Sequence, residues 1–334
     1  MKKTILSCLL LLLLLSIRST AQDVAFSQPY ANPLYLNPAF AGSGTTQRIG
    51  LNYRNEWPGM PTNGVTYNLS YDRNFIDSNN GIGFLVNVEK SSFTGPYIEP
   101  NQALTTTNIS LIYAHQFHIK SITLSAGVQA TYLNLSIDQS KLVYPDWTCN
   151  HWWDWGEELL RTQILLPDFS AGLLGYWKNY FAGFTVAHPT QPNESFYQDP
   201  SIILQTKYTF NVGAMIHIHT VTLTPTLFFK NQGTFHEQIV EVTLAMRHII
   251  SGVGFSFQET PDYTMQMGSS NPLESISITV GYCGKLFRIG YSYYTDLSKL
   301  TLATAGTHEG SLTFLVPYSK TLRKKINGLT IPAF

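Results

Sequence analysis

The sequence alternates apolar and polar residues with a period of two from about Gln47 to Lys320, in segments about ten residues long. In residues 64–72 the apolar positions are Val65, Tyr67, Leu69 and Tyr71, and the polar positions are Thr66, Asn68, Ser70 and Asp72. Successive side chains of a β-strand point to opposite sides, so each segment has one apolar and one polar face. The apolar face would point into the core of a soluble β-sandwich. In an outer-membrane barrel it would face lipid, and the polar face would line the lumen.

The first 21 residues have the features of a secretory signal peptide. Lys2 and Lys3 precede an apolar run at residues 5–15, and small residues at 19–21 suit cleavage before Gln22. We therefore leave residues 1–21 out of the fold. Their removal takes away three basic side chains and no acidic one, which leaves 18 basic and 21 acidic side chains and a net charge of −3. A nucleic-acid partner is not expected at this charge.

The alternating segments predict an all-β fold of roughly 14 strands, an even number, as single-chain bacterial barrels have. They lie near 47–57, 63–74, 81–90, 104–118, 121–137, 168–178, 180–188, 206–219, 221–230, 237–249, 251–259, 273–283, 286–297 and 310–319. No apolar stretch after Gln22 is long enough for a membrane helix. Pro225 lies inside a predicted strand and removes a ladder hydrogen bond, so we expect a bulge or kink there.

The predicted connections alternate between short and long. At one end they are as short as Lys178-Asn179. At the other end they are longer: Lys90 to Ala103, Asp138 to Pro167, His188 to Gln205, and Asp296 to Glu309. This alternation is typical of outer-membrane barrels, and a soluble sandwich has no reason for it. We therefore predict a transmembrane antiparallel β-barrel at residues 47–319, with both termini on the periplasmic side.

Two segments flank the predicted barrel. Residues 22–46 form an N-terminal arm, periplasmic or luminal, and residues 320–334 form a basic C-terminal tail. The arm holds Asn32-Pro33 and Asn37-Pro38, and an Asn-Pro pair favours a turn and keeps the Asn out of the helical region. We expect an ordered, non-helical arm that docks its aromatic side chains; a frayed terminus is the alternative. The tail could contact acidic machinery or lipid phosphates, or remain solvated.

Three sequence blocks follow the signal peptide in order: Asp23–Gln28, Asn32–Gly42 and Tyr53–Gly59. They match the patterns Asp-x-x-Phe-Ser-Gln, Asn-Pro-Leu-Tyr-x-Asn-Pro-Ala-[Tyr/Phe]-Ala-Gly and Tyr-Arg-Asn-x-Trp-Pro-Gly. In these blocks the chain resembles the PorP/SprF family of type IX secretion proteins from Bacteroidota, and its length and strand pattern match through the mature chain. The residues that carry the family motifs are Phe26, Asn32, Pro33, Tyr35, Asn37, Pro38, Arg54 and Trp57.

The resemblance implies an outer-membrane barrel that serves type IX secretion. In gliding species such a barrel supports export or surface retention of large adhesins. The implied partners are secreted surface proteins with a C-terminal sorting domain, periplasmic or lipoprotein secretion components, and outer-membrane lipid. No cofactor is implied.

A tryptophan cluster at residues 146–158 is a candidate partner-binding loop. Its aromatic residues are Trp147, Trp152, Trp153 and Trp155. Exposed Trp side chains bury a large area at low entropic cost, which suits a docking surface. An interfacial aromatic belt, or a loop that packs on itself, is the alternative interpretation.

Other polar residues give weaker signals. His217 and His219 share one strand face and could bind a metal, but no third ligand lies nearby in sequence. Arg54, Asp72 and Glu241 are expected to point inward, and inward charges usually pair across a lumen. No catalytic, metal-binding or cofactor-binding site is predicted.

The sequence therefore predicts a non-enzymatic outer-membrane barrel of the type IX system that supports export or surface anchoring of adhesins. A channel or uptake barrel for small solutes is the alternative, and an outer-rim hydrolase comes third. A lumen blocked by the arm would favour the first interpretation, and a continuous water path would favour the second.

Overall fold

The computed structural model describes residues 23, 26–60, 63–75, 77–95, 98–138, 161–196, 199–259, 273–297 and 301–318. The predicted signal peptide and the predicted tail at 320–334 lie outside these residues. The strands are β1 (Thr46–Glu56), β2 (Gly64–Phe75), β3 (Asn80–Gly95), β4 (Ile98–Ile119), β5 (Ile122–Ile137), β6 (Gln163–Trp177), β7 (Tyr180–Ala187), β8 (Lys207–Ala214), β9 (Ile216–Ile218), β10 (Val221–Gln232), β11 (Phe235–Met246), β12 (Ile249–Glu259), β13 (Leu273–Cys283), β14 (Phe287–Asp296) and β15 (Thr307–Pro317). The helical segments are η1 (Pro29–Ala31), α2 (Pro33–Leu36), η2 (Pro38–Phe40) and α3 (Thr301–Thr304).

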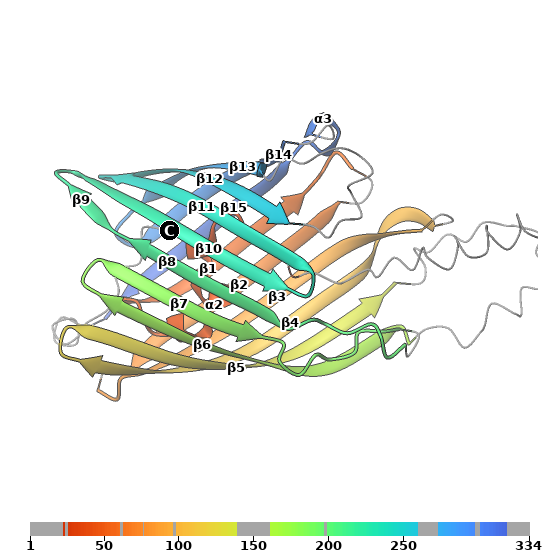
Figure 1. Ribbon diagram of the computed structural model, residues 1–334, viewed down its shortest axis with the longest axis horizontal. Coiled ribbons are helices and arrows are strands. Elements are labelled where there is room, and N and C mark those ends of the chain that lie inside the picture. Colours follow the sequence, from red (N-terminus) through yellow and green to blue (C-terminus); the bar gives the residue numbers. More distant parts are fainter. Residues whose placement is uncertain are drawn as a thin grey trace, which may run out of the picture.

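The strands form one antiparallel sheet that closes on itself (Figure 1). Apart from β8 and β9, each strand pairs with its neighbours in sequence. β1 also pairs with β15, and β10 pairs with β8, β9 and β11. β8 and β9 pair with β10 in one unshifted register, so they are two halves of one spanning strand interrupted at Met215. The described barrel therefore has fourteen spanning strands, as predicted.

The interruption lies where the sequence predicted an irregularity. In the shared register Ala214 is opposite Pro225 and Met215 is opposite Thr224. Pro225 has no N–H to give to the ladder, so pairing on this side is broken beside it. The pairing of β10 with β11 continues past Pro225 without a shift.

The two faces of the barrel wall differ in polarity in the way a membrane barrel requires. On β1, Leu51 and Tyr53 point outward and are 42% and 43% exposed, whereas Asn52 and Arg54 point inward and are each 5% exposed. The same arrangement recurs on the other strands, whose exposed large side chains are mostly apolar. A soluble sandwich would bury these apolar side chains, so the structure is a membrane barrel. Among the described residues, no helix has the length and apolar character needed to cross a membrane.

The two ends of the barrel differ in their connections. At the turn end, short turns join β2 to β3, β4 to β5, β6 to β7, β9 to β10, β11 to β12 and β13 to β14. At the loop end, longer segments follow β5, β7, β12 and β14. The predicted loop from Lys90 to Ala103 is wrong, because β3 and β4 continue as a hairpin to Gly95 and Ile98, with irregular register after Ser91.

Candidate functional site

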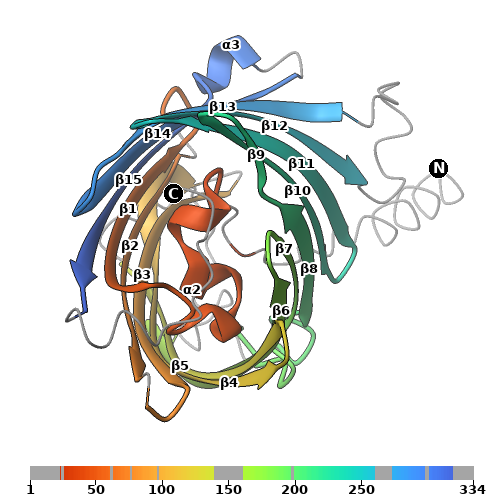
Figure 2. The same ribbon diagram turned by 90° about the vertical axis from the view of Figure 1, so that its left-hand side faces the viewer.

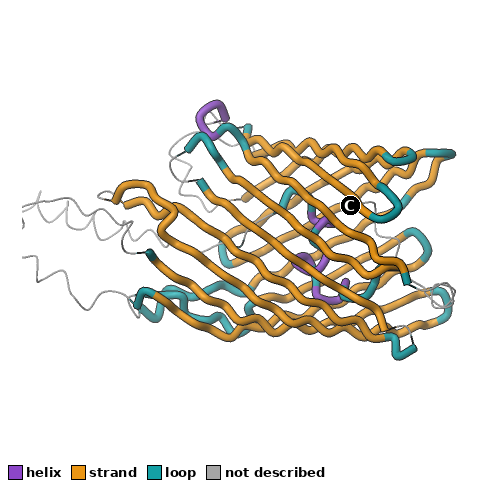
Figure 3. The backbone as a smooth tube through the Cα atoms, turned by 180° about the vertical axis from the view of Figure 1, so that it is seen from behind, coloured by secondary structure: helices purple, strands orange, loops and turns teal. Residues whose placement is uncertain are grey.

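The N-terminal arm lies inside the barrel (Figures 2 and 3). It runs from Asp23, among residues of the loop end, to Thr46, where β1 begins at the turn end. Its η1, α2 and η2 turns each begin at a proline, so the expectation of a non-helical arm is wrong. Asn32 and Asn37, which precede two of these prolines, are outside the helical region as expected. Proline suits the first helical position because it has no N–H to leave unpaired there.

Apolar side chains of the arm form a core with inward-facing residues of the wall. Phe40 and Ala39 are fully buried, and Leu34 is 1% exposed. One apolar cluster joins the arm to β6, β7, β10 and β12 through Leu174, Tyr176, Phe181, Phe228 and Ile250. The inner face of the wall is therefore apolar where the arm packs, and polar over most of the rest. Burial of this kind holds the arm as a packed element of the fold.

Glycines of the wall make room for the arm backbone. A Cβ atom on Gly81 of β3 would overlap the Ala41 carbonyl, and one on Gly127 of β5 would overlap Pro38 and Ala39. A Cβ atom on Gly172 of β6 would overlap the Asn37 side chain. Gly81 and Gly127 accept only a residue without a side chain, because the arm backbone comes this close to the sheet there.

Asn37 joins the middle of the arm to two strands. Its Oδ1 accepts a hydrogen bond from Ala39 N at 2.8 Å and so caps η2. Its Nδ2 donates to the carbonyl oxygens of Leu173 and Phe184, at 3.0 and 3.3 Å. These carbonyls belong to the paired strands β6 and β7. One amide therefore satisfies a helix end and fixes the arm to the wall.

At the turn end, a buried ion pair holds the end of the arm. Arg48 of β1 forms two 2.7 Å contacts with Asp72 of β2, through Nε and Nη2. Asp72 also accepts a hydrogen bond from Gly42 N at 2.8 Å, and Arg48 donates to the Phe40 carbonyl at 2.9 Å. Both charged groups thus have partners in the arm as well as each other, which offsets the cost of burying them.

A second buried carboxylate holds the beginning of η1. Glu309 of β15 is fully buried and accepts hydrogen bonds from the backbone N–H groups of Ser27 and Gln28, at 2.6 and 3.2 Å. Two backbone donors of the arm therefore have a buried acceptor inside the lumen.

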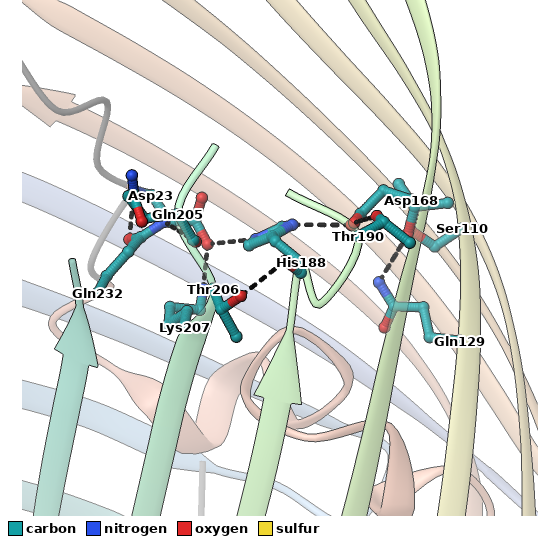
Figure 4. Close-up of polar contacts among 11 residues, drawn as sticks. Asp23, Ser110, Gln129, Asp168, His188, Thr190, Gln205, Thr206, Lys207 and Gln232 are labelled. Carbon is teal, nitrogen blue, oxygen red and sulfur yellow. Dashed lines mark hydrogen bonds and ion pairs between the residues drawn. The ribbon is translucent and has the colours of Figure 1, made fainter. Parts of the chain in front are cut away.

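At the loop end, the side chain of Asp23 is the centre of a polar cluster (Figure 4). Its Oδ2 lies 2.9 Å from His188 Nε2 and also forms an ion pair with Lys207 Nζ. His188 Nδ1 is 2.8 Å from Asp168 Oδ2, and Asp23 N donates to Gln232 Oε1 at 3.2 Å. We call Asp23, Asp168, His188, Lys207 and Gln232 the Asp23 cluster; it joins the start of the arm to β6, β8, β10 and the segment after β7.

The charges of the Asp23 cluster stabilise one another. Burial by itself raises the pKa of Asp23, but the adjacent cations Lys207 and His188 hold this pKa well below its usual range. Burial by itself lowers the pKa of His188, but the charge of Asp23 and hydrogen bonds with Asp168 and Asp23 raise it to about 9. His188 is therefore protonated at neutral pH, and both of its ring nitrogens donate to carboxylates.

Two larger cavities, and a smaller one of about 50 Å³, remain between the arm and the loop end. One of about 200 Å³ is lined by Phe26, Arg54, Glu56, Glu89, Glu237 and Glu241, and one of about 280 Å³ by Glu194 and several leucines. Asp23 borders both cavities. Burial, with the nearby Asp23 charge, raises the pKa of Glu194 to about 7. The part of the lumen that the arm leaves open is therefore rich in carboxyl groups and faces the loop end.

The family-motif residues lie on the arm and beside it. Phe26 and Tyr35 contact edge to face, with ring centroids 4.9 Å apart. Arg54 points inward and forms a 3.0 Å ion pair with Glu56, whereas Trp57 donates through Nε1 to Asp296 at 3.1 Å. Asn32 is 1% exposed. The structure thus brings together the arm residues and Arg54 around the lumen, and it places Trp57 at the loop end.

The other sequence predictions have mixed outcomes. The tryptophan cluster Trp147, Trp152, Trp153 and Trp155 lies outside the described residues. Two inward ion pairs of the described wall join neighbouring strands, Arg48 with Asp72 and Lys230 with Glu237, the latter at 2.9 Å, and Asp23 of the arm pairs with Lys207 of the wall. No group of metal-ligating side chains occurs in the described part of the chain, and His217 contacts Thr222 instead.

Sequence reasoning missed the residues that hold the arm: His188, Lys207, Asp168 and Glu309. One sequence signal could have indicated that the arm packs inside the lumen: a place where the alternation of apolar and polar residues is broken. Leu173 and Leu174 are adjacent apolar residues of β6, one exposed and one buried. An apolar residue on the polar face indicates that something packs inside the lumen.

Comparison with known proteins gives a family match. The family described as type IX secretion system membrane protein PorP/SprF matches residues 18–314. No curated protein matches the chain. Among solved structures, the chain is similar to the outer membrane protein Omp33 of Acinetobacter baumannii, at 8% identity and a TM-score of 0.42, over 82% of this chain and 99% of that one. It is also similar to a Rhodopseudomonas blastica porin mutant (7%, TM-score 0.32, 80% and 97%) and to KdgM porin (4%, TM-score 0.35, 80% and 98%).

Proposed function

The chain belongs to the PorP/SprF family of type IX secretion system membrane proteins, and on that premise we propose that it supports export or surface anchoring of large secreted adhesins. It is an outer-membrane barrel of a secretion-system family, which is not an enzyme family. In the proposal, the barrel binds the C-terminal sorting domain of the secreted protein and works with periplasmic or lipoprotein components. The short turns and the C-terminus are proposed to be periplasmic. The predicted periplasmic N-terminus is not part of the proposal, because Asp23, at the start of the arm, lies at the loop end.

The seated arm is the observation that supports this proposal most. It crosses the lumen, packs fully buried side chains against the wall and is anchored by polar groups near both of its ends. A small-solute channel needs a continuous water path, whereas an interaction barrel needs only a stable surface. An arm held in this way therefore favours an interaction barrel over the alternative of a solute channel.

The loop end is the proposed site of partner binding. The carboxyl-rich cavities open toward it, and the tryptophan cluster at 147–155 belongs in sequence to the loop between β5 and β6. Trp147, Trp152, Trp153 and Trp155 are proposed to bury against the sorting domain. Fully desolvated aromatic anchors carry a large share of binding energy in protein interfaces.

The test is a mild-detergent pull-down of the tagged full chain from native outer membranes. We expect a large surface protein to be retained, and we expect replacement of the four Trp residues by Ala to release it. The matched control is Trp177→Ala, because Trp177 lies on the outer face at the turn end and is 43% exposed. Full retention by the four-Trp variant would contradict the docking role of this loop.

A parallel measurement addresses the channel alternative. The purified barrel should give little steady conductance in planar bilayers while the arm is seated. Steady conductance of the unmodified protein, together with no co-purifying surface protein, would instead support a channel.

A further inference from the structure

Basic residues gather on the short turns at one end of the barrel. Lys120, Lys178, His219, Arg247 and Lys285 each lie in a different turn, and all five side chains are exposed. Among the described residues of the six turns, Asp77 is the one carboxylate. Within the described chain, none of the five basic side chains forms a salt bridge.

Backbone geometry does not explain these residue types. Lys120, Lys178, His219 and Arg247 have φ values of 55°, 51°, 53° and 55°. In two-residue hairpins these left-handed positions favour Gly, Asn or Asp, which adopt positive φ more easily than Lys or Arg. Four turns therefore carry a basic side chain where local conformation favours another residue.

Aromatic side chains place these turns at the membrane interface. Trp177 and Tyr180 flank the β6–β7 turn and stack with centroids 6.0 Å apart, and Lys178 Nζ lies 5.0 Å from the Trp177 ring. Tyr282 and Phe287 flank the β13–β14 turn, with centroids 5.8 Å apart. Exposed aromatic rings of a membrane barrel lie at headgroup level, so cations a residue or two away reach the lipid phosphates.

We propose that the cations Lys120, Lys178, Arg247 and Lys285 form a ring that binds the phosphate groups of anionic phospholipids. The four cations lie on four different turns, and these turns are spread around the circumference of the barrel (Figures 1 and 2), which matches a shell of lipid headgroups. An acidic protein would be better matched by a single continuous patch. Several described carboxyl groups, among them Glu56, Glu89, Glu194 and Glu237, lie toward the opposite end, and Asp72 at the turn end is already paired with Arg48.

The test measures lipid retention by native mass spectrometry of the purified full chain. The probes are phosphatidylglycerol and the zwitterionic phosphatidylcholine. The variant combines Lys120→Asn, Lys178→Asn, Arg247→Asn and Lys285→Asn. Asn accepts positive φ, so the variant should fold at least as well as the parent, and heat-modifiability on gels checks this.

We expect the parent to retain phosphatidylglycerol preferentially. Each cation removed should weaken phosphatidylglycerol binding by about fivefold at low salt, and by less at high salt. The matched control is Lys90→Asn with Arg161→Asn, two exposed cations of the loop end, which should leave binding unchanged.

Four results would overturn the proposal. Equal retention of the two lipids by the parent protein would do so, as would undiminished phosphatidylglycerol binding by the four-site variant. Displacement of the lipid by inorganic phosphate at the same concentration would show a site for free phosphate. Loss of a co-purifying acidic protein from the variant, with lipid retention unchanged, would assign the ring to a protein partner.

Discussion

His188 Nε2 lies 2.9 Å from Asp23 Oδ2, so one hydrogen-bonded ion pair joins the start of the arm to the segment that leaves β7. The partners are 165 residues apart in sequence, and the side chains of both are mostly buried. This contact closes the anchoring of the arm at the loop end, opposite the Arg48–Asp72 pair at the turn end. It also makes the seating of the arm sensitive to pH.

The arm should loosen as pH rises. The pKa of His188 is raised to about 9 in the folded protein, from 6.5, so its stabilisation is fully present below about pH 6.5 and is lost as pH rises through about 9. Glu194, whose pKa is raised to about 7, acts in the same direction because its ionisation is unfavourable in the folded state. The pKa of Asp23 is lowered, so its contribution is lost only in acid. Proteolysis of the arm, followed from about pH 6 to about pH 10, should accelerate over this range.

His188→Gln should remove most of this pH dependence, and the arm of the variant should be more accessible to protease at neutral pH. His219→Gln is the control, because His219 is exposed on a turn at the opposite end. A steep pH dependence that persists in His188→Gln would assign the effect to another group.

Glycines of the barrel wall should be required for the arm to pack in the lumen, but not for the strands to assemble into a barrel. Gly127→Val places a branched side chain where the Pro38 and Ala39 backbone lies, so the arm cannot seat. The strands themselves tolerate Val. We expect a heat-modifiable barrel with a protease-accessible arm and increased conductance. Gly310→Val is the matched control, since nothing lies within 4 Å of a Cβ atom there. Equal protease resistance in the two variants would show that the arm does not depend on this approach.

The barrel could be predicted from the sequence because its signal repeats. The alternation around Leu51 or Tyr67 depends on the local geometry of a strand alone. Each of the fourteen segments therefore indicates independently a strand with one apolar and one polar face. An irregularity at Pro225 was predicted because Pro225 lacks an N–H whatever surrounds it, but the break falls at Met215 of the neighbouring strand. The extension of the β3–β4 hairpin was not predicted, because Pro96 and Pro100 in the sequence indicate a loop.

The arm anchors could not be predicted, because their partners are far apart in sequence. Glu309 accepts from Ser27 and Gln28, which are 282 and 281 positions away, and nothing local marks Glu309 as different from other inward carboxylates. The two family-motif blocks in the arm indicated which residues are important, but not which residues they contact. Asn37 is an example: its cap of η2 follows from the Asn-Pro pair, whereas its bonds to β6 and β7 require the closed barrel.

Removing one partner of the Arg48–Asp72 ion pair should destabilise the barrel more than replacing both partners with apolar residues. Arg48→Ala leaves the Asp72 carboxylate, 2% exposed, without its cation, and loss of one partner of a buried pair costs about 3–5 kcal/mol. The double variant Arg48→Met with Asp72→Leu removes both charges and should recover a large part of this loss. Urea unfolding of the purified barrel measures each free energy. The interpretation would be contradicted if the double variant lost more unfolding free energy than the two single variants lose together.

Replacing Asn37 with Asp should loosen the arm more than replacing it with Ala, although the Asp side chain has nearly the same shape as Asn. Asn37→Ala loses the cap and the two bonds to Leu173 and Phe184, each worth about 1 kcal/mol. Asn37→Asp keeps the cap but aims a buried carboxylate at those two carbonyl oxygens, which costs more than a missing bond. Protease accessibility of the arm should therefore rise in the order parent, Asn37→Ala, Asn37→Asp. Asn79→Asp, in an exposed turn, is the control and should match the parent. If Asn37→Asp were as resistant as the parent, its side chain would have to be protonated or turned away from β6 and β7.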